Sequence, residues 1–175
     1  MIIVFTGNGK GKTTASLGHM MRAAGQGKRT LMLQFIKGPW ISGEHKFLDA
    51  HPALQKNIRV VRGGKGFVQI LGDKLPFATH KKAAQKTLER AKQAVRSRAY
   101  DLLVLDEVNV AVSLKLVTAT HVLAVAKQMP PEKIIILSGR YAPKSFIRAA
   151  DLVTEMKEIK HPFHKGKKAQ VGFEF

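Results

Sequence analysis

Residues 7–14, Gly-Asn-Gly-Lys-Gly-Lys-Thr-Thr, have the types and spacing of a loop that binds phosphate. They follow an apolar run, Ile2–Thr6, and precede an amphipathic stretch, which gives the order strand, glycine-rich turn, helix. Glycines let successive backbone N–H groups point at phosphate oxygens, while the helix N-terminus and the Lys12 ammonium add positive charge. The Thr13 hydroxyl is suited to Mg²⁺. The residues expected to hold a nucleoside triphosphate are Gly7, Asn8, Gly9, Lys10, Gly11, Lys12, Thr13 and Thr14.

The spacing of this loop departs from the usual pattern. A glycine normally stands five residues before the glycine of the Gly-Lys pair, but here Thr6 has that place and Gly7 follows one position later. A glycine-rich turn with an accidental Gly-Lys-Thr is the alternative. We favour phosphate binding because strand, loop and helix occur in the required order. The shortened turn indicates an unusual subgroup rather than an ordinary GTPase or motor.

Two adjacent carboxylates, Asp106 and Glu107, follow the apolar run 102–105. Nucleotide-binding folds place the carboxylates that handle a metal ion at such a strand end. A solvated strand end would look the same in isolation. Because the glycine-rich loop lies upstream in the same chain, we expect Asp106 or Glu107 to reach Mg²⁺, directly or through water.

Further loops after expected strands carry glycines, cations or aromatic side chains. They are residues 34–40 with Gly43 and Glu44, residues 62–67, and residues 138–140, the last being Ser-Gly-Arg with Arg140. Phe35, Trp40 and Phe67 could all be core residues, an interpretation that we favour for Phe35. Together the loops suggest a site for a triphosphate and for a large, partly apolar second substrate.

Alternating apolar runs and amphipathic stretches predict an α/β fold, a parallel sheet flanked by helices. The expected strands are 2–6, 30–35, 58–62, 101–106, 133–138 and 152–156, and the expected helices are 12–24, 81–98, 117–128 and 143–149. Ligands of such sheets bind beyond the carboxyl ends of the strands, so the loops described above should carry the chemistry.

Composition favours one domain spanning residues 1–175. No apolar run approaches the roughly 20 residues that span a bilayer, and the chain starts at a core strand without a targeting segment. With no cysteine, disulfides and thiol nucleophiles are excluded. We therefore expect a cytoplasmic protein that does not associate with membranes.

The chain is strongly basic, with 30 Lys and Arg against 12 Asp and Glu and a formal net charge of +18. Such a field attracts anions, nucleic acid among them. We favour a solvated basic face over a nucleic-acid groove, because the basic clusters lack interleaved aromatic residues. These clusters are residues 81–98, in which 82, 86 and 90 share a helix face, and Lys157, Lys160, Lys165, Lys167 and Lys168.

These segments together resemble the P-loop family of cob(I)alamin (corrinoid) adenosyltransferases. The most specific matches are the loop at 6–14 and the run Gln-Phe-Ile-Lys-Gly at 34–38. The shortened glycine spacing is the family's own. The other matching stretches, in family order, are residues 22–29, 105–109, 138–140, 150–155, 160–163 and 168–172.

The resemblance implies a RecA-like fold, usually dimeric, that transfers the 5′-deoxyadenosyl group of ATP to a Co(I) corrinoid and releases triphosphate. It implies Mg²⁺ or Mn²⁺ held by Thr13 and Glu107, with Asp106 beside them, and a reductant protein such as a flavoprotein. The reduced corrinoid is the nucleophile, so Lys12, Thr13 and Glu107 need only align it with ATP and stabilise the departing triphosphate. Arg140 is expected to bind substrate, and Phe67 matches an aromatic residue that faces the corrinoid.

The chain departs from the family at two places. Gln69 stands where members often carry a tryptophan, one of an aromatic pair that displaces the corrinoid's lower ligand before reduction. The chain also begins at the first strand, where many members have an extension over the corrinoid, so another segment should cover the site or the site should be more open. Two alternatives stay open, a basic P-loop ATPase acting with nucleic acid and a corrinoid or nucleotide carrier without turnover.

Overall fold

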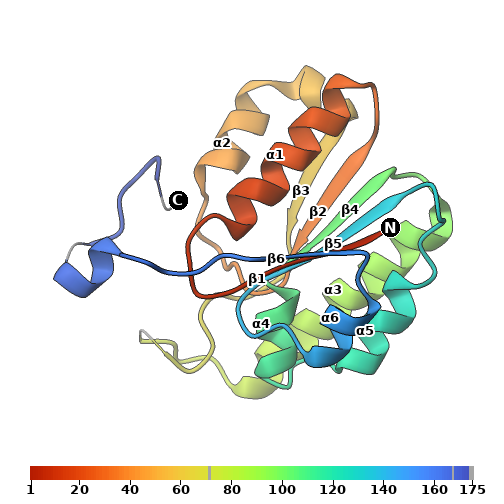
Figure 1. Cartoon of the computed structure of the whole chain (residues 1–175). Helices are drawn as coiled ribbons and strands as arrows, with labels where there is room; N and C mark the ends of the chain where they lie inside the picture. The colour runs from red at the N-terminus through yellow and green to blue at the C-terminus, as the bar shows by residue number, and fades with distance from the viewer. Residues whose placement is uncertain (71, 167, 174–175) are drawn as a thin grey trace.

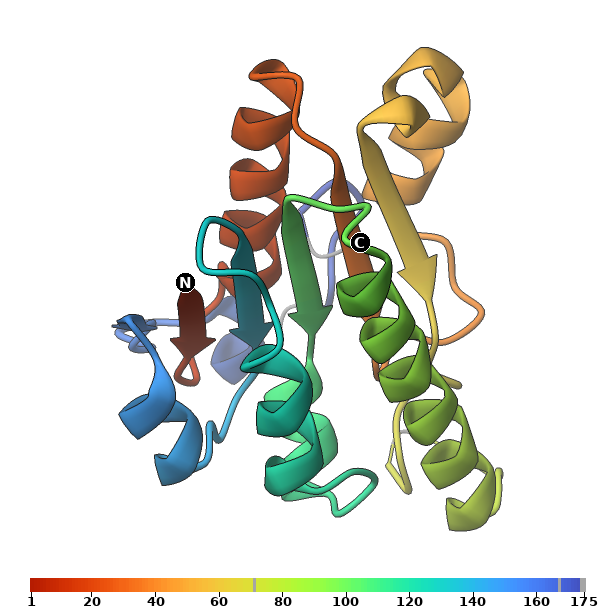
Figure 2. The ribbon, with the colours of Figure 1, turned by 90° about the vertical axis from the view of Figure 1, so that its right-hand side faces the viewer.

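The computed structural model describes residues 1–70, 72–166 and 168–173. Its centre is a six-stranded sheet in the order β3-β2-β4-β5-β1-β6, with every neighbouring pair parallel. The arrowheads of β1, β3, β4 and β5 point the same way in Figure 2. Their bounds are β1 Ile2–Thr6, β2 Thr30–Gln34, β3 Ile58–Arg62, β4 Leu102–Asp106, β5 Ile134–Ser138 and β6 Leu152–Glu155.

Helices cover both faces of the sheet (Figure 1), with α1 and α2 on one face and α3, α4, α5 and α6 on the other. Their bounds are α1 Lys12–Gly25, α2 Gly43–Ala50, α3 Phe77–Ser97, α4 Val108–Ser113, α5 Ala119–Ala126 and α6 Lys144–Ala149. Two short 3-10 helices, Pro52–Lys56 and Pro162–Lys165, complete the described elements. In this described part of the chain, no helix is long and apolar enough to cross a membrane.

The side chains of each central strand alternate between two apolar cores. Val4, Leu103 and Leu105 contribute to the core under α3 and α5, whereas Val104 and Ile136 contribute to the core under α1. Strands with apolar side chains on both faces are typical of a parallel sheet between two helical layers. The near-continuous apolar runs at 102–105 and 134–137 therefore indicated the layered arrangement correctly.

The strands agree with the sequence prediction to within one residue at each end. The helices needed more correction. The predicted helix 81–98 begins earlier, at Phe77, directly after Pro76. The predicted helix 117–128 is shorter at both ends, and its start is fixed by Thr118, whose side chain accepts a hydrogen bond from the His121 N–H and caps the helix. The short helices α2 and α4 were not predicted. The start of α2 lies in a segment that the sequence analysis treated as a loop, and residues 108–113 of α4 were assigned to no element.

The parallel arrangement brings the ends of β1, β2, β4 and β5 to one edge of the sheet. The loop 7–11 follows β1, and Glu107 and Gly139 directly follow β4 and β5. The sequence analysis predicted that the ligand site lies in the loops at this edge, as expected for an open parallel sheet.

Candidate functional site

The phosphate loop between β1 and α1 is packed against the backbone that follows β6. The Gly9 N–H donates to the Met156 carbonyl at 2.7 Å. A Cβ added at Gly9 would lie 2.7 Å from the carbonyl oxygens of Met156 and Lys157, and one at Gly7 would clash with Met156 as well. Glycine is therefore required at positions 7 and 9 by the close approach of a second backbone, whatever phosphate binding asks of the loop.

The Lys12 side chain is directed into this loop. Its ammonium donates to the carbonyl oxygens of Gly7 at 2.8 Å and Gly9 at 2.5 Å. Burial lowers the pKa of Lys12, and the nearby Glu107 carboxylate opposes this effect. A buried ammonium at the centre of a glycine-rich loop is placed to neutralise a bound polyanion.

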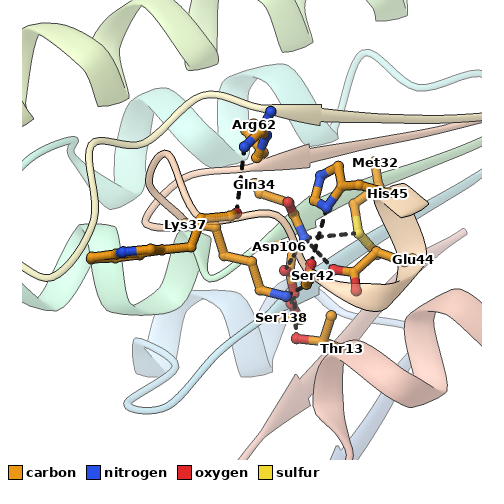
Figure 3. Close-up of polar contacts among 11 residues, drawn as sticks. Thr13, Met32, Gln34, Lys37, Ser42, Glu44, His45, Arg62, Asp106 and Ser138 are labelled. Atoms are coloured by element: carbon orange, nitrogen blue, oxygen red, sulfur yellow. Dashed lines mark hydrogen bonds and ion pairs between the residues drawn. The ribbon is translucent and has the colours of Figure 1, made fainter. Parts of the chain in front are cut away.

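Asp106 is the fully buried centre of a polar cluster formed by four elements of the fold (Figure 3). Its Oδ1 accepts hydrogen bonds from the hydroxyls of Thr13 at 3.0 Å and Ser138 at 2.7 Å, and its Oδ2 accepts one from Gln34 Nε2 at 3.4 Å. Burial raises the pKa of Asp106, and these donors act against the rise. The cluster connects α1, β4, β5 and β2 and fixes the Thr13 hydroxyl beside a carboxylate.

Glu107 is held beside this cluster by its backbone. Its φ of 59° is in the left-handed region, and its N–H donates to Ser138 Oγ at 3.2 Å. A Cβ on Gly139 would stand 3.0 Å from Glu107 Oε2, so a glycine at 139 leaves room for the carboxylate. Burial and the neighbouring Asp106 charge raise the pKa of Glu107 to about 7, while Lys12 opposes the rise.

Asn109 connects the surrounding loops through hydrogen bonds of its side chain. Its Nδ2 donates to the carbonyls of Phe5 at 3.2 Å and Gly139 at 2.9 Å, so one buried side chain connects the ends of β1 and β5 to α4. Asn109 is within the stretch 105–109 that carries the family resemblance, but sequence alone gave it no role.

Glu44 is a second residue that the sequence analysis left without a role. It stands in the first turn of α2, accepts a hydrogen bond from Lys37 Nζ at 2.8 Å and another from Gln34 Nε2 at 3.2 Å. Burial alone would raise its pKa, but hydrogen bonds from Lys37 and Ser42 lower the pKa of Glu44 to about 2. Through Gln34, this ion pair extends the polar cluster from Asp106 to α2 (Figure 3). Its signal in the sequence was Ser42 before Glu44, which is typical of a helix start.

A cleft of about 1090 Å³ joins these groups. One part is formed by the phosphate loop with Glu107, and another by apolar side chains of α1 and α2, including Met21 and Phe47. Its volume slightly exceeds the roughly 300–1,000 Å³ of sites for a drug-sized ligand, as expected if two substrates meet there. The predicted site residues that line the cleft are Asn8, Gly9, Lys10, Gly11, Lys12, Thr13, Thr14, Phe67, Glu107 and Arg140.

The other two predicted residues, Gly7 and Asp106, do not line the cleft: Gly7 opens the loop, and the buried Asp106 accepts a hydrogen bond from Thr13, which does line it. The oxygen atoms of Thr13, Asp106 and Glu107 suit Mg²⁺, which takes one or two carboxylates and completes its shell with substrate phosphates and water. Within the described ranges, no group of three or more His, Cys, Asp and Glu side chains forms a separate metal centre. Thr13, Asp106 and Glu107 therefore fit a cation that is shared with a bound triphosphate.

The parallel sheet, the phosphate loop after β1 and the two carboxylates at the end of β4 define a P-loop nucleotide-binding protein of the RecA-like α/β class. The family model described as ATP:corrinoid adenosyltransferase BtuR/CobO/CobP matches residues 1–175. The chain belongs to this family.

Curated relatives agree over the full length. A corrinoid adenosyltransferase of Sinorhizobium sp is 37% identical, covering 100% of this chain and 80% of the relative. Those of Escherichia coli (strain K12) and Pseudomonas aeruginosa are 33% and 36% identical, covering 100% of this chain and 85% and 83% of the relatives. Among solved structures, a KaiC-like protein of Pyrococcus horikoshii has a TM-score of 0.46 at 17% identity, covering 99% of this chain and 66% of that chain.

Proposed function

We propose that this protein transfers the 5′-deoxyadenosyl group of ATP to the Co(I) centre of a reduced corrinoid. The cobalt electron pair attacks the 5′ carbon, a Co–C bond forms, the C–O bond to the triphosphate breaks, and triphosphate leaves with the bonding electrons. The observation that supports this most directly is the family match over residues 1–175, together with a cleft that joins a phosphate loop to apolar and aromatic walls.

We assign the residues roles that agree with their places in the cleft or next to it. The loop 7–14 holds the triphosphate, and the Lys10, Lys12 and Arg140 side chains neutralise the charge that develops as it departs. Thr13 and Glu107, with Asp106 behind them, would hold Mg²⁺ or Mn²⁺. Such a cation supplies charge stabilisation to the leaving group.

Phe67 supplies an aromatic wall for the corrinoid at the edge of the same cleft. Because the corrinoid itself provides the nucleophile, the task of the protein is alignment and electrostatic stabilisation. We further propose a cytoplasmic homodimer that receives its corrinoid in reduced form with the help of a protein such as a flavoprotein. These proposals rest on the family resemblance.

The alternative function is that of a basic P-loop ATPase that acts with nucleic acid. In that case the same loop would hold ATP for hydrolysis. Lys82, Lys86 and Arg90 are exposed on α3, as the sequence predicted, while Lys167 of the second cluster lies outside the described residues. Exposed basic side chains alone do not indicate a groove, and the family match favours adenosyl transfer.

One anaerobic assay separates the two functions. ATP, cobalamin and a strong reductant are incubated with the protein, the visible spectrum follows the formation of a Co–C bond, and the inorganic product is identified. Adenosyl transfer should give adenosylcobalamin and intact triphosphate. Release of phosphate that is stimulated by oligonucleotides, without a spectral change, would refute the proposed function.

A further inference from the structure

Two exposed aromatic side chains, Trp40 and Phe67, pack against each other, and Phe67 lines the cleft. Trp40 is 61% exposed and Phe67 is 45% exposed, yet their ring centroids are only 5.7 Å apart, with an interplanar angle of 42°. They come from the loops after β2 and β3, at the edge of the sheet that carries the site. Large aromatic side chains that remain exposed together are typical of a surface that contacts a ligand or partner.

The two loops that carry this pair are interlocked. A Cβ on Gly66 would stand 3.0 Å from atoms of the Trp40 ring, and a Cβ on Gly38 would stand 2.6 Å from the Gly66 nitrogen. The backbone of the Trp40 loop is also fixed from β3, because Arg62 Nη1 donates to the Pro39 carbonyl at 2.6 Å. The indole is therefore held in place by its loops while its surface stays open.

The far side of the Phe67 loop is connected to α3 by a buried hydrogen bond between Asp73 and His80. Asp73 Oδ2 accepts the Gln69 N–H at 2.9 Å and contacts His80 Nε2 at 2.9 Å. The side chains of Asp73 and His80 are both buried. Gln69 itself has a φ of 58°, a conformation that few side chains adopt, and its hydrogen bond to Asp73 compensates for part of that cost.

We propose that Trp40 is a substrate-positioning residue that contacts the corrinoid together with Phe67. This inference rests on the proposed function, and it extends that function by naming a contact on a different loop from Phe67. A corrin is a broad conjugated ring with apolar faces, and two adjacent aromatic rings held by rigid loops offer it a matching surface. Phe67 lines the cleft that contains the phosphate loop, so a ring resting on this pair would be next to a bound triphosphate.

The test compares Trp40→Leu, Trp40→Phe and the neighbouring control Ile41→Ala, whose parent side chain is also exposed. The probe is cob(II)alamin in the presence of Mg²⁺ and ATP, with binding followed by the visible spectrum, alongside KM values for ATP and cobalamin. Trp40→Leu should weaken cobalamin binding about tenfold, the scale of one aromatic contact, while the KM for ATP stays unchanged. Trp40→Phe should restore most of the affinity, and Ile41→Ala should resemble the parent.

A double-mutant cycle with Phe67→Leu gives an independent measurement. If both rings contact one corrinoid, the two losses should be non-additive, because they share a ligand and touch each other. A parent protein that adenosylates cobalamin while Trp40→Leu binds it equally well would overturn this inference and leave the proposed function intact. Equal losses for ATP and cobalamin, or a changed oligomeric state with unchanged cobalamin affinity, would also overturn it. A parent protein that binds no corrinoid would refute the proposed function itself.

Discussion

Replacing Glu107 by glutamine should stabilise the ligand-free protein at neutral and alkaline pH while lowering its activity. The Glu107 carboxyl loses its proton near pH 4.5 in an unfolded chain, but burial and the Asp106 charge raise its pKa to about 7 in the folded protein. The folded state therefore disfavours ionisation of the Glu107 carboxyl. Its stability falls as the pH rises from about 4.5 to about 7 and stays low above that range.

The size of the effect follows from the two pKa values. Each pKa unit corresponds to about 1.4 kcal/mol, so the ionised carboxylate costs about 3 kcal/mol of folding free energy at pH 8 and about 1 kcal/mol at pH 5. Glutamine carries no charge and avoids this cost. For a chain of this length, 1 kcal/mol shifts the melting temperature by about 2–4 °C, which predicts a rise of about 6–12 °C for Glu107→Gln at pH 8.

Calorimetry of the parent and Glu107→Gln at pH 5 and pH 8, with a chelator and without nucleotide, measures this difference. Glu132→Gln, an exposed carboxylate in the loop before β5, is the matched control and should change little at either pH. The adenosylation rate of Glu107→Gln should fall at least about tenfold, and its response to added Mg²⁺ should weaken, because the carboxylate no longer holds the cation. Equal melting temperatures for Glu107→Gln and the parent at pH 8 would show that Glu107 is not under electrostatic strain.

Other substitutions test the loop and its surroundings. Lys12→Ala should lower the adenosylation rate about 10²–10³-fold, since it removes about 3–4 kcal/mol of charge stabilisation from the leaving group, and a folded variant of near-normal rate would exclude the loop as the active site. Gly9→Ala should abolish tight ATP binding by forcing the loop away from Met156, whereas the control Gly18→Ala, in open space on α1, should raise stability by about 0.5–1 kcal/mol in thermal unfolding. Asp73→Asn should raise the KM for cobalamin more than that for ATP, and equal effects on both would contradict a local role.

The sequence predicted those parts of the fold in which local pattern and tertiary environment agree. The runs at 102–105 and 134–137 are apolar at every position because both faces of β4 and β5 are buried, so their strands were recognisable. The phosphate loop was equally clear, because its glycines and Lys12 occur at fixed spacing next to a strand and a helix.

The features that sequence reasoning missed depend on contacts between distant segments. The Glu44 carboxylate is positioned by hydrogen bonds from Lys37 and Gln34. The helix that carries Glu44, α2, is short. The contact between Trp40 and Phe67 joins two loops that belong to different strands, and no local pattern records it. The sequence also did not reveal that Gly9 lies against the Met156 backbone, because Met156 is far from Gly9 in the chain.

The position of β1 between β5 and β6 has a consequence for synthesis of the protein. Among the six strands of the sheet, β1 leaves the ribosome before the others, yet it pairs on both sides with the two that follow last, Ile134–Ser138 and Leu152–Glu155. Until those residues emerge, Ile2–Thr6 has no neighbours in the sheet, and the phosphate loop lacks the Met156 carbonyl that fixes Gly9. Pairing between such distant segments is slow, because loop closure costs entropy before contacts repay it. A nascent chain should therefore be unable to bind nucleotide until translation has passed residue 156, so a chain released before that point would expose an apolar N-terminal strand to aggregation.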